Sequence, residues 1–150
     1  MSIGRIVCAT RGGEAGRRTQ ERAISLAKER GVALDFLCVF EPDLANDLNK
    51  ELAGAVYAEQ RWLGRALLGI ARARAKKEGV YAGTEVRFGP VLQTIEAYLR
   101  QVGASVLVIG APRVDSTLAM FKPSRMEGFA AQVERDTGVE VILVTPHEER

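Results

Sequence analysis

Five short strand-like segments alternate with longer segments of helical pattern, and this alternation constrains the fold more than any other feature of the 150-residue chain. The strand-like segments cover residues 5–10, 33–40, 84–88, 105–109 and 140–144. Strands that alternate with helices of this length are joined by right-handed crossovers and pair in parallel. We therefore expect an α/β fold in which an open five-stranded parallel sheet carries helices on both faces, as a single domain over residues 1–150.

The predicted helices cover residues 17–30, 43–78, 90–101 and 124–136, and residues 111–123 predict an irregular loop. A single straight helix over residues 43–78 would span roughly 54 Å. Because that length exceeds the size expected of this domain, we expect a break near Gly54. In open parallel sheets, ligands bind at the carboxyl ends of the strands, where the strand order reverses. The loops after the first, second and fourth strands are therefore the places to search for a site.

Charge and hydropathy exclude several classes of partner. Twenty-one basic residues face nineteen acidic ones, a net charge of +2, which is too balanced to indicate nucleic-acid binding. The apolar runs are far shorter than a membrane span, so we expect no membrane insertion. No signal peptide follows Met1, and we expect a cytoplasmic protein.

The two cysteines, Cys8 and Cys38, lie in strand-like runs. We interpret them as buried, reduced thiols, with a disulfide between neighbouring strands as the alternative. The single histidine, His147, lies near the end of the chain, away from both. The sequence therefore predicts neither a Cys–His catalytic pair nor a metal site.

A glycine-rich segment follows the first strand, but its order is G-G-x-x-G (Gly12, Gly13, Gly16) instead of the dinucleotide fingerprint G-x-G-x-x-G. We interpret it as a tight strand-to-helix turn. The chain also lacks a phosphate loop of the G-x-x-x-x-G-K-[ST] type and a nucleophile elbow. No catalytic residue is assigned, and we expect a binding module; a dinucleotide-dependent enzyme is a further hypothesis.

Nearly the whole chain resembles the universal stress protein family. The resemblance is carried by the segments RIVCATRGGEAGRRTQERAISLAKERG, LDFLCVFEPD, VRFGPVLQTIEAYLRQVGASVLVIGAPR and VEVILVTP. It implies an adenine-nucleotide alpha-hydrolase-like sheet with strand order 3-2-1-4-5 and a regulatory role in stress response. It also implies, for ATP-binding members, a crevice between the first and fourth strands and a motif G-x2-G-x9-G-[ST] that contacts the phosphates.

In this sequence the motif keeps its spacing and loses two glycines. Gly110 matches the first glycine and Ser124 the hydroxyl, whereas Arg113 and Pro123 stand at the other glycine positions. The acidic residue that the family carries after the first strand corresponds to Arg11. Because Pro123 has no N–H to offer a phosphate, the comparison predicts weakened or absent ATP binding.

The residues that the resemblance places around the crevice are Thr10, Arg11, Gly12, Val39, Gly110, Arg113 and Ser124. We expect no bound cofactor, with ATP or AMP as the alternative. The two arginines, Arg11 and Arg113, either fill the crevice by pairing with carboxylates, bind a different anionic small molecule, or face solvent. A protein partner is a further option, and a nucleotide-binding stress protein with slow hydrolysis or autophosphorylation is the alternative function.

The last strand carries an apolar run from Val139 to Val144 and is expected at a sheet edge. An exposed apolar edge favours pairing with another chain unless it is covered. The resemblance implies a homodimer through this strand. The alternative is an edge covered by the chain's own helix and ended by Pro146.

Overall fold

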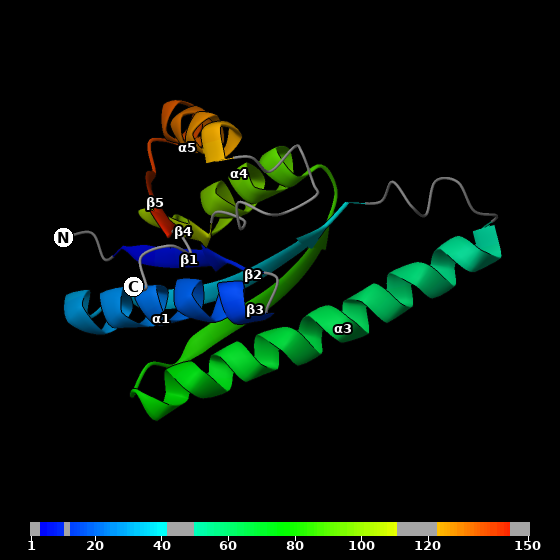
Figure 1. The fold of residues 1–150 in the computed structure, drawn as a ribbon, viewed down its shortest axis with the longest axis horizontal. Coiled ribbons are helices and arrows are strands. Elements are labelled where there is room, and N and C mark those ends of the chain that lie inside the picture. The colour runs from blue at the N-terminus through cyan, green and yellow to red at the C-terminus, as the bar shows by residue number, and fades with distance from the viewer. Residues whose placement is uncertain (1–3, 11–12, 42–49, 111–122, 145–150) are drawn as a thin grey trace.

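The structure, a computed structural model, describes residues 4–10, 13–41, 50–110 and 123–144. Its five strands form one parallel sheet in the order β3-β2-β1-β4-β5, which confirms the predicted fold class and strand order (Figure 1). In chain order the elements are β1 (Arg5–Ala9), α1 (Gly13–Arg30), β2 (Ala33–Phe40), α3 (Lys50–Lys77), β3 (Ala82–Phe88), α4 (Val91–Val102), β4 (Val106–Gly110), α5 (Pro123–Thr137) and β5 (Glu140–Val144).

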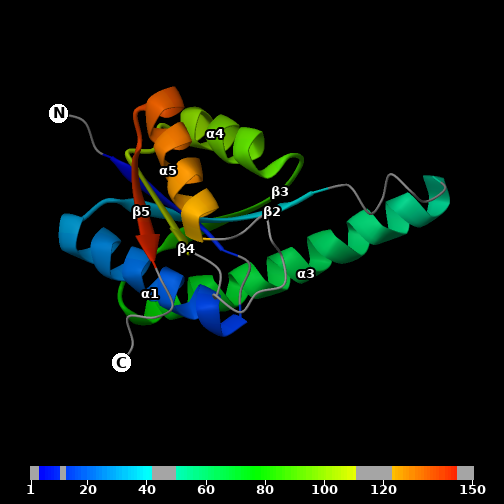
Figure 2. The ribbon, with the colours of Figure 1, turned by 45° about the horizontal axis from the view of Figure 1, so that its top comes forward.

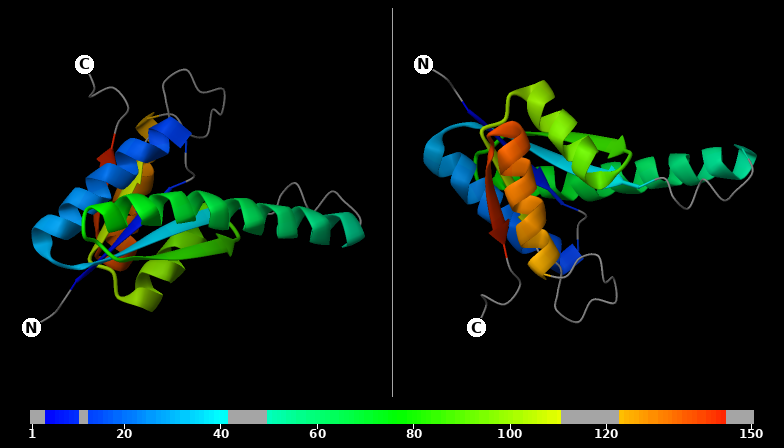
Figure 3. Two further views of the ribbon diagram at one scale, coloured as in Figure 1. Left: turned by 90° about the horizontal axis from the view of Figure 1, so that it is seen from below. Right: turned by 90° about the horizontal axis from the view of Figure 1, so that it is seen from above.

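Two helices cover each face of the sheet: α1 and α3 lie on one side, α4 and α5 on the other (Figure 3). Successive side chains of a strand point to opposite faces, so each central strand contributes side chains to two hydrophobic cores, one on each face of the sheet. In β1, Ile6 and Cys8 pack with Ala23 of α1, whereas Val7 packs with Leu99 of α4. This two-sided burial explains why the central strands are continuous apolar runs.

Helix α3 runs without a break from Lys50 to Lys77, so the expected interruption near Gly54 is wrong. The prediction assumed that the domain's diameter limits the helix. Instead, the amino-terminal part of α3 projects beyond the sheet, where no packing limits its length (Figure 3). Gly54 lies within the continuous helix, and a Cβ added to it would meet nothing within 4 Å outside the backbone of its own helix. Residues 43–49 of the predicted helix lie outside the described residues.

Other element ends differ from prediction by a few residues. β3 begins at Ala82, two residues before the predicted start, because it pairs with β2 from Leu34 onward. Helix α1 begins at Gly13, four residues before the predicted start. The first turn of a helix leaves its N–H groups without helical partners in any case, so glycine is tolerated there.

Both cysteines are free and buried, as predicted. In the strand register Cys8 lies opposite Phe36 and Cys38 opposite Val86, so the two thiols do not face each other. Burial raises the pKa of the Cys8 thiol far above its usual range, which keeps it protonated and unreactive.

Within the described segments, no helix combines the length and the apolar character that crossing a membrane requires.

Candidate functional site

The candidate site lies where β1 and β4 end side by side. The two strands pair in parallel up to Ala9 and Ile109. The strand order reverses at this point, since β2 follows β1 on one side and β4 lies on the other. This is the position at which open α/β sheets bind ligands. Of the predicted site residues, the structure describes Thr10, Val39 and Gly110 here, and only 7% of Thr10 is exposed.

Thr10 is held by two hydrogen bonds at the end of β1. Its main-chain N–H donates to the carbonyl of Leu37 in β2 across 2.9 Å. Its hydroxyl oxygen accepts a hydrogen bond from Nε2 of Gln20, across 3.2 Å. These contacts fix both the backbone and the hydroxyl of the residue that leads into the crevice.

Gln20 and Arg74, which sequence reasoning missed, extend this contact away from the strand. Gln20 is 1% exposed, and its Oε1 accepts a hydrogen bond of 2.7 Å from Nη1 of Arg74. A buried amide left without partners costs about 1–3 kcal/mol, so both ends of this side chain need such contacts. The chain Arg74–Gln20–Thr10 therefore connects α3, through α1, to the end of β1.

Val39 lies two residues beyond Leu37, which is paired with Ala9 in the last register pair of β1 and β2. Main-chain groups along a strand alternate in direction, so those of Val39 face the same side as those of Leu37. That side is where β1 has ended. The Val39 side chain is 5% exposed and packs in the core. The main chain of Val39, and not its side chain, is therefore the part directed toward the crevice.

Two glycines allow α1 to lie against the strand ends. A Cβ at Gly16 would stand 2.8 Å from the Thr10 hydroxyl oxygen, and a Cβ at Gly110 would overlap Oγ1 of Thr19. Gly16 is the last glycine of the G-G-x-x-G segment, so that glycine serves close helix–strand packing. Gly110 has the same packing role, in addition to its match with the family motif.

The remaining predicted site residues are not placed. Arg11, Gly12 and Arg113 lie outside the described residues. Ser124 belongs to the first turn of α5, and its side chain lies outside what the structure describes. Whether the two arginines approach the crevice stays a prediction.

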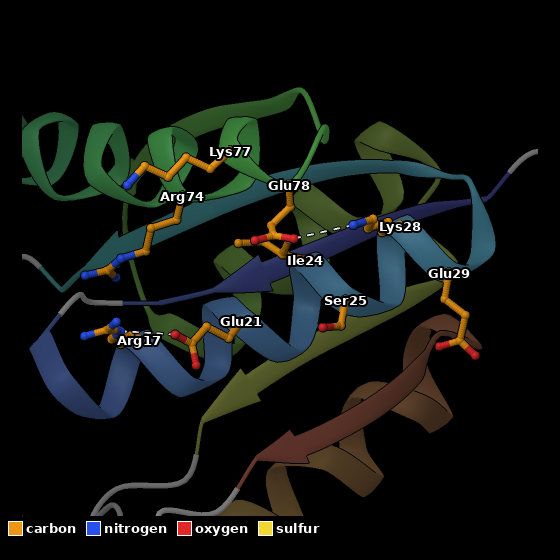
Figure 4. A pocket seen from close by; sticks show the side chains of 9 residues that line it. All are labelled: Arg17, Glu21, Ile24, Ser25, Lys28, Glu29, Arg74, Lys77 and Glu78. Atoms are coloured by element: carbon orange, nitrogen blue, oxygen red, sulfur yellow. Dashed lines mark hydrogen bonds and ion pairs between the residues drawn. The ribbon is translucent and has the colours of Figure 1, made fainter.

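A groove of about 610 Å³ lies between α1 and α3 (Figure 4). Its walls carry two ion pairs: Arg17 Nε to Glu21 across 3.1 Å, and Lys28 Nζ to Glu78 across 3.5 Å. The groove is lined by Arg17, Glu21, Ile24, Ser25, Lys28, Glu29, Arg74, Lys77 and Glu78. Arg74 thus belongs both to the groove and to the hydrogen-bond chain that ends at Thr10.

No cluster of histidine, cysteine, aspartate or glutamate suited to a metal ion occurs in the described part of the chain.

Several solved structures of universal stress proteins share this fold. A universal stress protein family member from Burkholderia pseudomallei aligns with a TM-score of 0.71 at 20% identity, covering 95% of this chain and 96% of the other. A universal stress protein in complex with cAMP aligns at 0.63 and 21% identity, covering 97% and 98%. One from Archaeoglobus fulgidus in complex with dAMP aligns at 0.65 and 17% identity, covering 95% and 97%.

At these identities the structures show a shared fold alone. The comparison with curated proteins gave no match. The sequence model of the universal stress protein family, however, matches residues 2–144, nearly the whole chain. The chain belongs to the universal stress protein family.

Proposed function

We propose that this protein is a regulatory binding module that binds ATP weakly and accepts an adenosine monophosphate-type nucleotide in the crevice between β1 and β4. The observation that carries the proposal is an asymmetry between the two halves of the site. At the strand ends that would meet the nucleoside, hydrogen bonds hold Thr10 and core packing holds Val39. The segment that would meet the outer phosphates has Arg113 and Pro123 in place of glycines.

The nucleoside half is supported by main-chain geometry. The Val39 main chain faces the side on which β1 ends, and such groups can bond the edge of a purine without help from a particular side chain. Thr10 and Gly110 border the same space. The solved structures described as complexes with cAMP and dAMP support a nucleotide with one phosphate as the ligand class.

The phosphate half favours a shorter anion. Glycines let the main chain approach phosphate closely, and its N–H groups hold the charge. Pro123 supplies no N–H, and Arg113 adds a long side chain where close approach is needed. The cationic side chains of Arg11 and Arg113 still favour a single phosphate over none.

Titration calorimetry with AMP, cAMP and ATP tests this proposal. We expect AMP or cAMP to bind more tightly than ATP, and to raise the thermal midpoint accordingly, because a ligand bound only by the folded state stabilises it. The decisive variant restores the motif, R113G combined with P123G. It should strengthen ATP binding by about tenfold or more, which corresponds to about 1.4 kcal/mol. It should not strengthen AMP binding, because AMP has no outer phosphates and the variant loses the positive charge of Arg113.

Two outcomes contradict the proposal. One is a natural protein that binds ATP more tightly than AMP, or that retains ATP through purification. The other is a restored motif that leaves ATP affinity unchanged. The matched control is R135G, a change of the same type on the exposed side of α5 away from the strand ends.

The proposal includes a homodimer through β5, which lies at one edge of the sheet (Figure 2). The N–H of Glu140 faces β4, because it donates to the Ser105 carbonyl. By alternation, the N–H groups of Val141 and Leu143 face outward. Val141 already donates to Glu134 Oε2 across 3.1 Å, so pairing between copies would use Leu143.

Light scattering at micromolar concentration tests the dimer. We expect the mass of a dimer for the natural protein. E134A removes the intramolecular acceptor of the Val141 N–H and should tighten dimerisation by leaving that edge donor to a partner strand. A monomeric mass for both proteins would exclude pairing through β5.

A further inference from the structure

We propose that the groove between α1 and α3 is a second binding site, for a small phosphate-bearing molecule, and that Arg74 couples this site to the crevice. The proposed coupling depends on the nucleotide binding proposed above, whereas phosphate binding in the groove does not depend on it. The inference is drawn from the charge distribution in the groove and from the hydrogen bond between Arg74 and Gln20.

The charges in the groove are separated along its length. Figure 4 shows the side-chain ends of Arg17, Arg74 and Lys77 toward the end of the groove at which α1 begins. Lys28 and Glu78, at the other end, neutralise each other.

At the cationic end, Arg17 Nε donates a hydrogen bond to the carboxylate of Glu21. Both side chains are about half exposed, Arg17 at 51% and Glu21 at 56%. Lys77 has no ion pair within the part of the chain that the structure describes. Glu29, the remaining acid of the lining, lies away from Arg74 and Lys77, beyond Ser25 (Figure 4). The cationic end therefore carries excess positive charge, and it combines guanidinium groups with an ammonium, donors that suit phosphate oxygens.

The groove also suits the body of a small organic phosphate. Its volume of about 610 Å³ falls in the range of roughly 300–1,000 Å³ usual for small-molecule sites. Ile24 is 4% exposed and gives the groove an apolar floor, and Ser25 adds a hydroxyl beside it. A phosphate at the cationic end would leave the neutral remainder of the ligand over these two residues.

Arg74 is the residue through which the groove would act on the crevice. Its Nη1 donates a hydrogen bond to the neutral amide oxygen of Gln20. A phosphate oxygen is a stronger acceptor for a guanidinium than an amide is. A bound phosphate would therefore draw Arg74 away from Gln20, and the contact between Gln20 and Thr10 would lose its support. Occupation of the groove would then weaken nucleotide binding in the crevice, and the effect must be reciprocal.

The first experiment titrates inorganic phosphate alone against the protein, with sodium chloride at matched ionic strength as the reference. We expect phosphate to raise the thermal midpoint and chloride to leave it unchanged. K77Q should weaken phosphate binding about tenfold. The matched control R72Q removes one positive charge from an exposed residue of the same helix that does not line the groove, and should bind phosphate as the natural protein does.

Two results of this titration overturn the site. One is a phosphate effect no larger than that of chloride. The other is an equal loss in K77Q and R72Q, which would show general attraction to a basic helix.

The second experiment measures AMP affinity with and without phosphate. We expect phosphate to weaken AMP binding about fivefold in the natural protein, and to have little effect in K77Q. Direct competition between phosphate and AMP in the crevice would persist in K77Q and would overturn the coupling. R74Q should lose the dependence on phosphate altogether.

Failure of the two proposals can be told apart. If AMP does not bind, the proposed nucleotide function fails while the phosphate titration still decides the groove. If AMP binds and phosphate does not, the proposed nucleotide function is supported and the proposed phosphate site in the groove is rejected.

Discussion

The phenol of Tyr98 donates a hydrogen bond of 3.0 Å to Oδ2 of Asp35, joining α4 to β2 across 63 positions of sequence. The other oxygen of Asp35 accepts a hydrogen bond of 3.0 Å from Arg5 Nη1. Asp35 is only 6% exposed, and each of its two oxygens has a hydrogen-bond donor, Arg5 or Tyr98. Removal of either donor leaves a buried carboxylate oxygen without a partner.

Tyr98→Phe should therefore lower the free energy of unfolding by about 1–3 kcal/mol, because the Asp35 carboxylate loses a hydrogen-bond donor while the ring volume is kept. Urea denaturation measures the change. Tyr81→Phe is the control, since Tyr81 is 81% exposed and its hydroxyl faces water. An equal effect of the two substitutions would contradict the buried contact.

Stability should also fall at alkaline pH, in a way that depends on Tyr98. Burial, together with the negative charge of Asp35, raises the pKa of Tyr98. A raised pKa means that the folded protein holds the phenol proton more tightly than the unfolded chain does. Its contribution is complete below the unfolded pKa, about 10, and is lost as pH rises above that value. Thermal melts from pH 8 to 11 should show a steeper decline for the natural protein than for Tyr98→Phe.

Glycine substitutions test the packing of α1 on the strand ends. Gly16→Ala places a Cβ against the Thr10 hydroxyl and should destabilise the fold by about 1–3 kcal/mol through overpacking. Gly54→Ala meets no neighbouring atom and should stabilise α3 by about 0.5–1 kcal/mol. Denaturant midpoints of the two variants should move in opposite directions. A neutral Gly16→Ala would mean that Thr10 and Gln20 yield to the added methyl group.

Glu96 and Asp136 form a carboxyl pair between α4 and α5. Burial, together with a hydrogen bond to Asp136, raises the pKa of Glu96, and its Oε2 is buried without a partner among the described residues. A raised carboxyl pKa stabilises the fold at pH below the unfolded value, about 4.3, and this contribution is lost as pH rises through the folded pKa. The natural protein should therefore lose this contribution on going from pH 4 toward neutrality.

Glu96→Gln should raise the thermal midpoint at neutral pH, because the amide can donate to Asp136 without taking up a proton. It should also remove the part of the pH dependence that Glu96 causes. Glu127→Gln is the control, an exposed carboxylate of α5. The prediction fails if the two amide variants have the same midpoint at every pH.

The sheet was predictable from sequence because its causes are local. Burial on both faces produces continuous apolar runs in β1 and β4, and strand–helix alternation restricts the topology. The break near Gly54 was predicted wrongly because the domain's diameter does not limit a helix that projects past the sheet. The family resemblance selected Thr10, Val39 and Gly110, and the structure places these three residues at or near the ends of their strands. The link from Arg74 to Gln20 did not, because it joins residues 54 positions apart and depends on how two helices lie together.

A partial signal for that link was present. Gln20 shares a helical face with Ala23 and Ala27, so a polar residue stands where the pattern calls for an apolar one. A buried polar residue on such a face needs partners. Its partners could not be named from sequence, because several arginines of α3 were equally available.

The projection of α3 has a practical consequence. Trp62 is the only tryptophan of the chain; it belongs to α3 and is 70% exposed. It lines neither the groove nor the strand ends, so its emission should not change when a small molecule binds in either place. A blue shift in its emission would instead report that another macromolecule has covered this helix, which separates association from ligand binding in a single optical measurement.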